Sequence, residues 1–331
     1  MRVLVVCSYR DYIKDGIAPF IKEQVEALRA LDIEELSSNI EYYLLHGKGI
    51  TGYLKEIPSL RKKIRKYKPD VIHAHYGLSG LLANLATRRV PVVTTYHGND
   101  INDEKLLRYS KWTRRLSAWN IFVNRHMMER VNGEKHKNYT LIPCGIDDTL
   151  FVPLKKEDCR KQLAESGKWK VERGKKYVLF PKMFYDEVKD YPLAKAVIDR
   201  VNSEKLIVNS EVELLEFTGF TREESAMMMN AVDCLLMTSK MEGSPQVIKE
   251  AMACGCPIVS VDVGDVKERL SGIAGCYVAK TREPEELSDL LRKALSFEGK
   301  TNGRDALIEQ GLSNNLIAKQ LIEIYSEVLK K

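Results

Sequence analysis

The sequence predicts an α/β protein of two Rossmann-like domains, each with a parallel sheet covered by helices on both faces. Apolar runs of strand length alternate with segments of helical spacing through residues 1–143, and the alternation restarts at residue 176. Between the two series, residues 144–153 contain Gly145 and Pro153 and no periodic pattern, which is typical of a link between domains. A chain of 331 residues is long enough for two domains of ordinary size.

Each element of this alternation can be placed from its apolar spacing. In the first series we expect strands at 2–7, 41–46, 69–75, 91–97, 119–124 and 138–143. We expect helices between them at 19–31, 59–67, 80–86 and 105–116. In the second series we expect strands at 176–181, 206–208, 214–220, 233–239, 257–261 and 275–279. We expect helices at 190–203, 221–230, 245–254, 265–270 and 284–296. A terminal helix is expected over 314–330, with its apolar residues on one stripe.

Composition narrows the class of protein. The apolar share of 44% can fill two cores, and the net charge of +6 suits an anionic ligand or an anionic membrane without requiring either. Seven cysteines with one close pair, Cys254 and Cys256, predict free buried thiols and a reducing, cytosolic compartment. The first residues resemble a strand rather than a signal peptide, and no stretch approaches the roughly 20 apolar residues of a membrane span.

The stretch SKMEGSPQVIKEAMACGCPIVSVDVGD, 239–265, carries the strongest functional signal. A strand ends before it, and Ser244 is expected to cap a helix that begins at Pro245. The positive end of that helix would face the carboxyl edge of the sheet, where it favours a phosphate. Glu242 and Glu250 flank this helix start eight positions apart and could accept hydrogen bonds from a sugar and a ribose. The spacing fits a nucleotide sugar, although a surface glutamate pair at an ordinary helix start would give the same pattern.

This stretch resembles the E-x7-E donor-site signature of family-four retaining glycosyltransferases, which have the GT-B fold. The resemblance extends over most of the chain, through the segments around 7–28, 70–83, 94–102, 141–151, 191–198 and 215–239. It implies two Rossmann-like domains facing across a cleft, with a C-terminal helix that crosses back to the first domain. The expected parts are an acceptor-side domain, a nucleotide-sugar domain and a terminal helix: 1–150, 151–312 and 313–331.

The resemblance assigns roles in the donor site. Glu242 would contact the donor sugar and Glu250 the ribose. The backbone of the turn between them would contact the sugar and the diphosphate, and Val247 would pack near the ribose; the turn residues are Gly243, Ser244, Pro245 and Gln246. The family usually has an Arg and a Lys on the diphosphate. Here Lys189 fits the Lys position and Lys182 stands where Arg is expected, which replaces a planar fork by a point charge. Solvent-exposed lysines are the alternative at both positions.

Further residues are assigned by the same resemblance. Gly219 and Phe220 would border the base, unless Phe220 belongs to the core. In the first domain His97 would lie near the transferred sugar and the acceptor, with Asp100 positioning its loop. The other candidates on the acceptor side are His75, the less favoured His73, and Gly16, the single glycine where the family has a glycine-rich loop. A histidine at a strand end is as often structural as functional.

The resemblance implies a reaction: transfer of a sugar from a UDP- or GDP-linked donor to an acceptor hydroxyl, with retention of configuration. The acceptor would be a glycan or lipid-linked glycan of cell-surface polysaccharide synthesis. We expect no cofactor beyond the donor and no metal, because the chain has no Asp-x-Asp pair and its six histidines have no ligand spacing. A non-catalytic sugar-nucleotide-binding protein and a sugar-nucleotide epimerase are the alternatives. A dinucleotide oxidoreductase is disfavoured because no G-x-G-x-x-G follows the first strand.

The segment LRKKIRKYK, 60–68, predicts a basic amphipathic helix. Such a helix can lie on an anionic membrane, so the protein could be peripheral to the inner face of the membrane. It can equally pack its apolar stripe on the sheet and leave its basic residues in solvent. Nucleic acid is not expected as a partner, because no aromatic residues are interleaved as in a nucleic-acid-binding motif.

Overall fold

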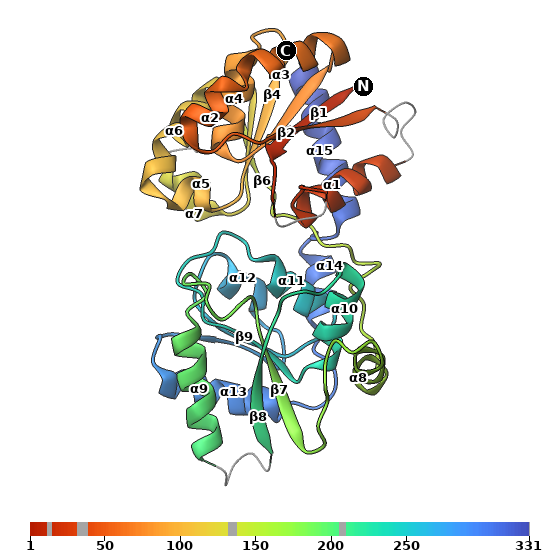
Figure 1. The fold of residues 1–331 in the computed structure, drawn as a ribbon, viewed down its shortest axis with the longest axis vertical. Helices are drawn as coiled ribbons and strands as arrows, with labels where there is room; N and C mark the ends of the chain where they lie inside the picture. Colours follow the sequence, from red (N-terminus) through yellow and green to blue (C-terminus); the bar gives the residue numbers. More distant parts are fainter. Residues whose placement is uncertain (12–14, 32–38, 132–137, 205–209, 331) are drawn as a thin grey trace. The chain divides into compact units, whose positions relative to one another are not determined.

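The computed structural model describes residues 1–11, 15–31, 39–131, 138–204 and 210–330. These residues form two compact units (Figure 1). Unit 1 contains residues 1–145 together with 312–331, and unit 2 contains residues 146–311. Each unit is built on its own parallel sheet.

The sheet of unit 1 has six strands in the order β2-β1-β3-β4-β5-β6. The strands are β1 (Val3–Ser8), β2 (Ile40–Leu45), β3 (Val71–His75), β4 (Val92–Tyr96), β5 (Trp119–Phe122) and β6 (Tyr139–Leu141). All neighbouring strands pair in parallel, so their carboxyl ends share one edge. Because β1 lies between β2 and β3, the chain reverses its direction across the sheet there, and ligands of such sheets bind at that point.

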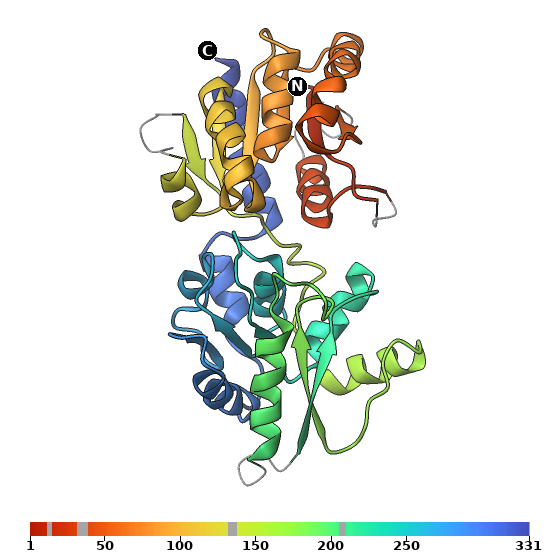
Figure 2. The same cartoon turned by 60° about the vertical axis from the view of Figure 1, so that its left-hand side comes forward.

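Helices cover both faces of this sheet. They are α1 (Pro19–Ala30), α2 (Gly49–Lys55), α3 (Ile57–Tyr67), α4 (Gly77–Ala86), α5 (Asn99–Asn102), α6 (Glu104–Leu116), α7 (Arg125–Arg130) and α15 (Asn314–Leu329). Successive residues of β1 point to opposite faces. Val3 and Val5 join a core with α1 and α15, whereas Leu4 and Val6 join a core with α3 and α4. The C-terminal helix α15 therefore forms part of unit 1, as Figure 2 also shows in blue.

Unit 2 has a five-stranded parallel sheet in the order β11-β10-β9-β7-β8. The strands are β7 (Lys175–Phe180), β8 (Glu211–Glu216), β9 (Cys234–Met237), β10 (Ile258–Val261) and β11 (Cys276–Ala279). Its helices are α8 (Lys156–Glu165), α9 (Tyr191–Ser203), α10 (Arg222–Ala231), α11 (Gln246–Ala253), α12 (Val266–Leu270), α13 (Pro284–Leu295) and α14 (Gly303–Glu309). Here β7 lies between β8 and β9, so the reversal point is beside the loops that follow β7 and β9.

The predicted fold class is confirmed: two Rossmann-like parallel-sheet units, with the C-terminal helix packed on the first. The strand expected at 206–208 lies outside the described residues. The sequence did not predict five helices, which are short or bury few residues: α2, α5, α7, α8 and α14. Helix α8 buries only Cys159 and Leu163. All seven cysteines lie in the described part of the chain, where each is buried and none forms a disulfide.

No helix among the described residues has the length and apolar character required to cross a bilayer.

Candidate functional site

In unit 2, the loops after β7 and β9 are joined by hydrogen bonds. Lys240 N donates to Val188 O at 2.8 Å, and the Thr238 hydroxyl donates to Lys189 O at 2.8 Å. These bonds bring Lys189, which precedes α9, to the loop that precedes α11. The Lys189 ammonium there forms an ion pair with the Glu242 carboxylate, and each of the two side chains is 15% exposed. Two residues predicted for the donor site are therefore in contact.

Arg282 ties the same two loops together. Its guanidinium donates to Thr238 O at 2.7 Å and to Ser239 O at 2.9 Å, and it pairs with Asp190 at 2.7 Å. Asp190 has a left-handed backbone (φ 55), so the loop turns sharply directly after Lys189. The sequence did not reveal Arg282, because it follows β11, far along the chain from both loops.

The turn before α11 differs from the prediction at Ser244. Helix α11 begins at Gln246, Pro245 is its N-cap residue, and the helix has no side-chain cap. The Ser244 hydroxyl donates instead to Asp265 Oδ2 at 2.7 Å, and the same oxygen accepts from Arg269 Nε at 2.9 Å. The expectation that Ser244 caps the helix was wrong, because the helix begins one residue later than expected, so Pro245 holds the N-cap position and Ser244 lies outside the helix.

Gly264 allows the turn to lie close to the next loop. It has φ +60, and a Cβ there would meet the carbonyl oxygen of Gly243 at 2.4 Å. Ser244 contacts Asp265 in the same pair of loops. The backbone of the turn is therefore held by a glycine contact and a serine–aspartate bond.

Glu250 lies on α11 and is only 4% exposed. Its carboxylate pairs with Arg222 at 2.7 Å, and the Arg222 guanidinium also lies over the ring of Phe151, 4.7 Å from the centroid. Arg222 is the first residue of α10, whose N-cap Thr221 forms a capping box with Glu224. Arg222 was not predicted as part of the site, and the capping box that starts its helix was the only local signal in the sequence.

The remaining residues predicted for the donor site are more exposed. The Lys182 side chain is 46% exposed and pairs with Asp186 at 3.1 Å. Burial acts to raise the pKa of Asp186, but the hydrogen bond and charge of Lys182, the Val188 N–H and the charge of Lys189 together outweigh it, so the pKa is lowered. Gly219 has φ +76 and open space around it, and Phe220 is half-buried against Phe217, 5.9 Å between ring centroids. Val247 is half-buried on the first turn of α11.

In unit 1, Asp100 organises the loop after β4. Its buried carboxylate accepts from three backbone N–H groups: Gly77 at 2.9 Å, His97 at 3.1 Å and Gly98 at 2.9 Å. Burial raises the pKa of Asp100, and these N–H groups partly oppose that shift. Asp100 thus fixes the backbone that carries His97.

Three histidines form a row at the carboxyl edge of this sheet. His75 Nδ1 lies 3.0 Å from His97 Nε2, and the ring centroids of His73 and His75 are 4.4 Å apart. At the inner end His73 bonds Tyr325 of α15 at 2.6 Å, and at the outer end His97 Nδ1 lies 3.4 Å from Cys144 Sγ. Burial lowers the pKa of His73 to about 3 and that of His75 well below its ordinary value, so both are neutral at pH 7.

This row was not predicted as a unit. His73 was correctly expected to point into the fold. His75 is buried as well, and its ring contacts His97 on the side away from Cys144. Period-two spacing places His73 and His75 on one face of β3, which is the signal that could have indicated the stack.

Gly16, the remaining acceptor-side candidate, is required by its surroundings. It has φ +73, and a Cβ would lie 2.1 Å from the ring of Tyr9. Among the described residues, no group of three or more His, Cys, Asp or Glu side chains is arranged to hold a metal ion.

Two family models match the chain. The model described as Glycosyltransferase Family 4 matches residues 20–150, and the model described as Glycosyl transferases group 1 matches residues 194–296. A relative in sequence is the N,N'-diacetylbacillosaminyl-diphospho-undecaprenol alpha-1,3-N-acetylgalactosaminyltransferase of Campylobacter jejuni. It is 26% identical over 236 residues, which cover 63% of this chain and 60% of that protein.

Solved structures of low sequence identity share the fold. Sucrose-phosphate synthase from Thermosynechococcus elongatus has a TM-score of 0.77 at 18% identity, with both chains covered completely. HepE from Anabaena, in complex with UDP-glucose, has a TM-score of 0.68 at 15% identity, with 99% of this chain and 100% of that chain covered. The solved structures show the shared GT-B fold, and the two family models, which together match most of the chain, identify it as a glycosyltransferase of the family-four type.

Proposed function

We propose that the protein transfers a sugar from a nucleoside diphosphate sugar, UDP- or GDP-linked, to an acceptor hydroxyl with retention of configuration. The observation that carries this proposal is the pair of ion pairs around the start of α11. Glu242 pairs with Lys189 and Glu250 pairs with Arg222, one on each side of a helix start that has no side-chain cap. A helix N-terminus between two carboxylates suits a diphosphate with a sugar on one side and a ribose on the other.

In this proposal each donor-side residue has one task. Glu250 accepts the ribose hydroxyls and Glu242 a hydroxyl of the donor sugar. Lys189, assisted by Lys182, stabilises the charge that develops on the leaving diphosphate. The backbone of residues 243–246 contacts the sugar and the diphosphate, while Val247, Gly219 and Phe220 line the nucleoside.

We assign the acceptor side to unit 1. His97 is the proposed contact to the transferred sugar, supported by Asp100, Gly16 and His75. Both ring nitrogens of His97 already have protein partners, His75 and Cys144. A hydrogen bond from His97 to a sugar hydroxyl therefore requires an exchange of its Cys144 contact, which is the weaker of the two because a thiol is a poor hydrogen-bonding group.

The leaving group and the acceptor complete the proposal. Cationic side chains and a helix N-terminus can stabilise a diphosphate without a divalent ion, so we propose metal-independent transfer. HepE was solved with UDP-glucose, which supports a nucleotide sugar as donor. The Campylobacter relative is named for an undecaprenol-linked acceptor, which supports a lipid-linked glycan as the acceptor. A free glycan is the second acceptor that we propose, with the reaction serving polysaccharide synthesis.

The test is a panel of UDP- and GDP-sugars, first for thermal stabilisation and then for transfer. A ligand at about 100 times its dissociation constant stabilises the folded state by roughly 2.7 kcal/mol. We expect one nucleotide to stabilise the wild type and Glu250→Ala to lose that shift. Transfer to a glycan with chelator present, and retention of the anomeric configuration by NMR, would support the mechanism.

Two alternatives give different results in the same panel. A sugar-nucleotide-binding protein would show the thermal shift without turnover with any acceptor. An epimerase would convert the free sugar nucleotide in the absence of acceptor. A protein that no sugar nucleotide stabilises would contradict the donor-site assignment.

A further inference from the structure

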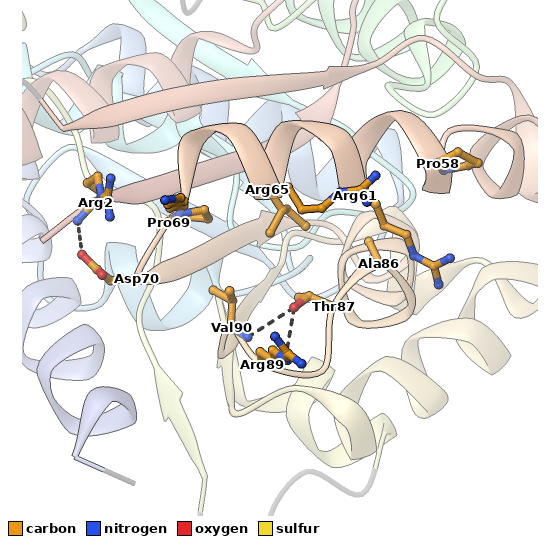
Figure 3. A pocket seen from close by; sticks show the side chains of 12 residues that line it. Arg2, Pro58, Arg61, Arg65, Pro69, Asp70, Ala86, Thr87, Arg89 and Val90 are labelled. Atoms are coloured by element: carbon orange, nitrogen blue, oxygen red, sulfur yellow. Dashed lines mark hydrogen bonds between the residues drawn. The ribbon is translucent and has the colours of Figure 1, made fainter.

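A hollow of about 830 Å³ lies at the opposite edge of the unit 1 sheet from the histidine row (Figure 3). It is formed by one side of α3, the end of α4 and the turn that follows it, and the residues that precede β1 and β3. Its walls are at the amino ends of the strands. His97 follows β4 at the carboxyl end, about 16 Å away along five strand residues. The hollow is thus separate from the candidate site already described.

Positive charge dominates the lining of this hollow. We call it the basic groove, and its charged lining residues are Arg2, Arg61, Arg65, Lys68, Arg89 and Asp70. Within the described part of the chain, none of the five cations forms an ion pair with a carboxylate, whereas Lys63 on the same α3 pairs with Glu41. The single carboxylate, Asp70, accepts a bond from the backbone N–H of Arg2 at 2.6 Å.

The negative ends of two helices offset only part of this positive charge. Helices α3 and α4 both end at the basic groove, and each carboxyl end contributes about −0.5 elementary charge. With Asp70 the negative side amounts to roughly −2, against five cations, so an excess of about three positive charges remains. Like charges gathered around one hollow repel one another, and an anion between them would remove that repulsion.

The kinds of cation indicate the kind of anion. Four of the five are arginines, whose planar guanidinium binds phosphate oxygens in pairs. Arg61 and Arg65 are one turn apart on the same side of α3, and Arg89 approaches from the α4–β4 turn, as Figure 3 shows. The guanidinium of Arg61 donates one hydrogen bond to Leu85 O at 2.9 Å, and this bond orients it.

Exposed leucines adjoin the basic groove. The hollow continues over Leu85, Leu116 and Leu329, which are 42%, 53% and 45% exposed. A phosphate that carries an apolar tail would find both a basic and an apolar surface here, whereas a soluble phosphate would use the arginines alone.

We propose that the basic groove is a second anion site, which binds the phosphate group of a phosphorylated ligand independently of the nucleotide sugar. The phosphate can belong to an anionic phospholipid headgroup or to a soluble phosphoester. The proposal does not depend on the donor chemistry, because it concerns the other edge of the sheet.

The test compares three full-length proteins: the wild type, a groove variant with Arg61→Gln, Arg65→Gln and Arg89→Gln, and a control with Lys55→Gln, Lys62→Gln and Lys66→Gln. The control residues are exposed on α2 and α3, do not line the basic groove, and lower the net charge by the same amount. Inorganic pyrophosphate binding is measured by calorimetric titration. Sedimentation with vesicles of phosphatidylcholine, with and without phosphatidylglycerol, measures headgroup binding. The donor site is unaltered in all three proteins, so its contribution cancels.

We expect the groove variant to bind at least one probe about tenfold more weakly than the control, since each lost charge-assisted phosphate bond has an effect of this size. Loss of pyrophosphate binding alone would identify a soluble phosphoester, and loss of vesicle binding would identify a lipid headgroup. Equal binding by the groove variant and the control, or no binding of either probe by the wild type, would overturn the proposal. Thermal unfolding checks the fold; should the groove variant not fold, the single Arg89→Gln variant replaces it, because Arg89 lies outside the helices.

Discussion

The carboxyl edges of the two sheets hold their polar side chains in opposite ways. In unit 1 the two inner histidines of the row, His73 and His75, are neutral at pH 7, 1% exposed and bonded to protein groups. In unit 2 the polar groups are charged and paired, and the Lys189 and Glu242 side chains stay 15% exposed. Neutral buried histidines avoid the cost of desolvating ions, whereas a charged pair near solvent can exchange its partner for a ligand. We therefore expect acidification to lower the stability of unit 1, and removal of charged side chains to lower ligand binding and activity in unit 2.

The largest effect is expected from Lys189. Lys189→Ala removes the cation nearest Glu242, and loss of one group that stabilises developing charge lowers kcat by about 10²–10³-fold. Lys189→Arg keeps the charge and should retain much of the activity. The matched control is Lys182→Ala, whose side chain is 46% exposed and paired with Asp186, and which should cost less than about tenfold. If steady-state kinetics showed a larger loss of kcat in Lys182→Ala than in Lys189→Ala, our assignment of the two lysines would be reversed.

Glu250 comes second. Glu250→Ala removes the proposed ribose contacts, and hydrogen bonds to a charged group are worth about 1.5–3 kcal/mol, so the dissociation constant of the nucleotide should rise about 10- to 100-fold. Arg222→Ala should weaken binding less, because in our proposal it positions Glu250 without contacting the ribose. Titration of both variants and the double variant separates the roles. If Arg222→Ala alone matched Glu250→Ala, the carboxylate would act only through its ion pair.

Acidification should affect unit 1 before unit 2. All six histidines of the chain lie in residues 1–145, and His73 has a pKa of about 3 in the folded protein against an ordinary value of 6.5. The unfolded chain binds the extra proton below pH 6.5, so the stability from a neutral His73 is complete above that pH and is lost as pH falls toward 3. Between pH 7 and 5.5 we expect a loss of about 1 kcal/mol from His73, and a further loss from His75, whose pKa burial also lowers.

Calorimetry at several pH values tests this prediction, with His73→Asn as the comparison variant. The free energy of unfolding should fall less in the variant than in the wild type over the same pH interval, because the unfolded variant has no His73 to take up a proton. Asp100, whose pKa burial raises, acts in the opposite sense, because its protonation on acidification favours the folded state. An unchanged pH dependence in His73→Asn would show that the row does not control acid stability.

The sequence predicted the fold well because apolar periodicity directly reports burial. The strand Cys234–Met237, for example, is wholly buried between two helix layers, so its apolar run is unambiguous. Short helices were missed where few residues are buried, as in α8. The error at Ser244 has a different cause. A local rule predicts a helix cap, but the partner, Asp265, comes from the next loop along the sheet.

The candidate site was predictable only where one segment contains it. Glu242 and Glu250 lie in one stretch, and their resemblance to a known signature located them. Their partners Arg222 and Lys189 come from other loops, so the pairing was visible only in the folded chain. Arg282 was not predictable, because a long side chain that bonds backbone carbonyls leaves no pattern in the sequence. The roles of all these residues remain predictions.

The smallest effect should come from Gly264, and it separates backbone fit from charge in unit 2. Gly264→Ala and Gly272→Ala both place a side chain at positive φ, +60 and +75, which costs about 1–2 kcal/mol of stability in each. Only at Gly264 does the new Cβ meet a neighbour, the carbonyl oxygen of Gly243 at 2.4 Å; Gly272 has open space. Gly264→Ala must therefore shift the turn that leads into α11, and we expect nucleotide affinity to fall a few-fold there while Gly272→Ala leaves it unchanged. Urea unfolding and nucleotide titration measure the two effects separately. Equal affinity in both variants would mean that the position of this turn does not limit binding, and that the paired charges alone determine how unit 2 holds its ligand.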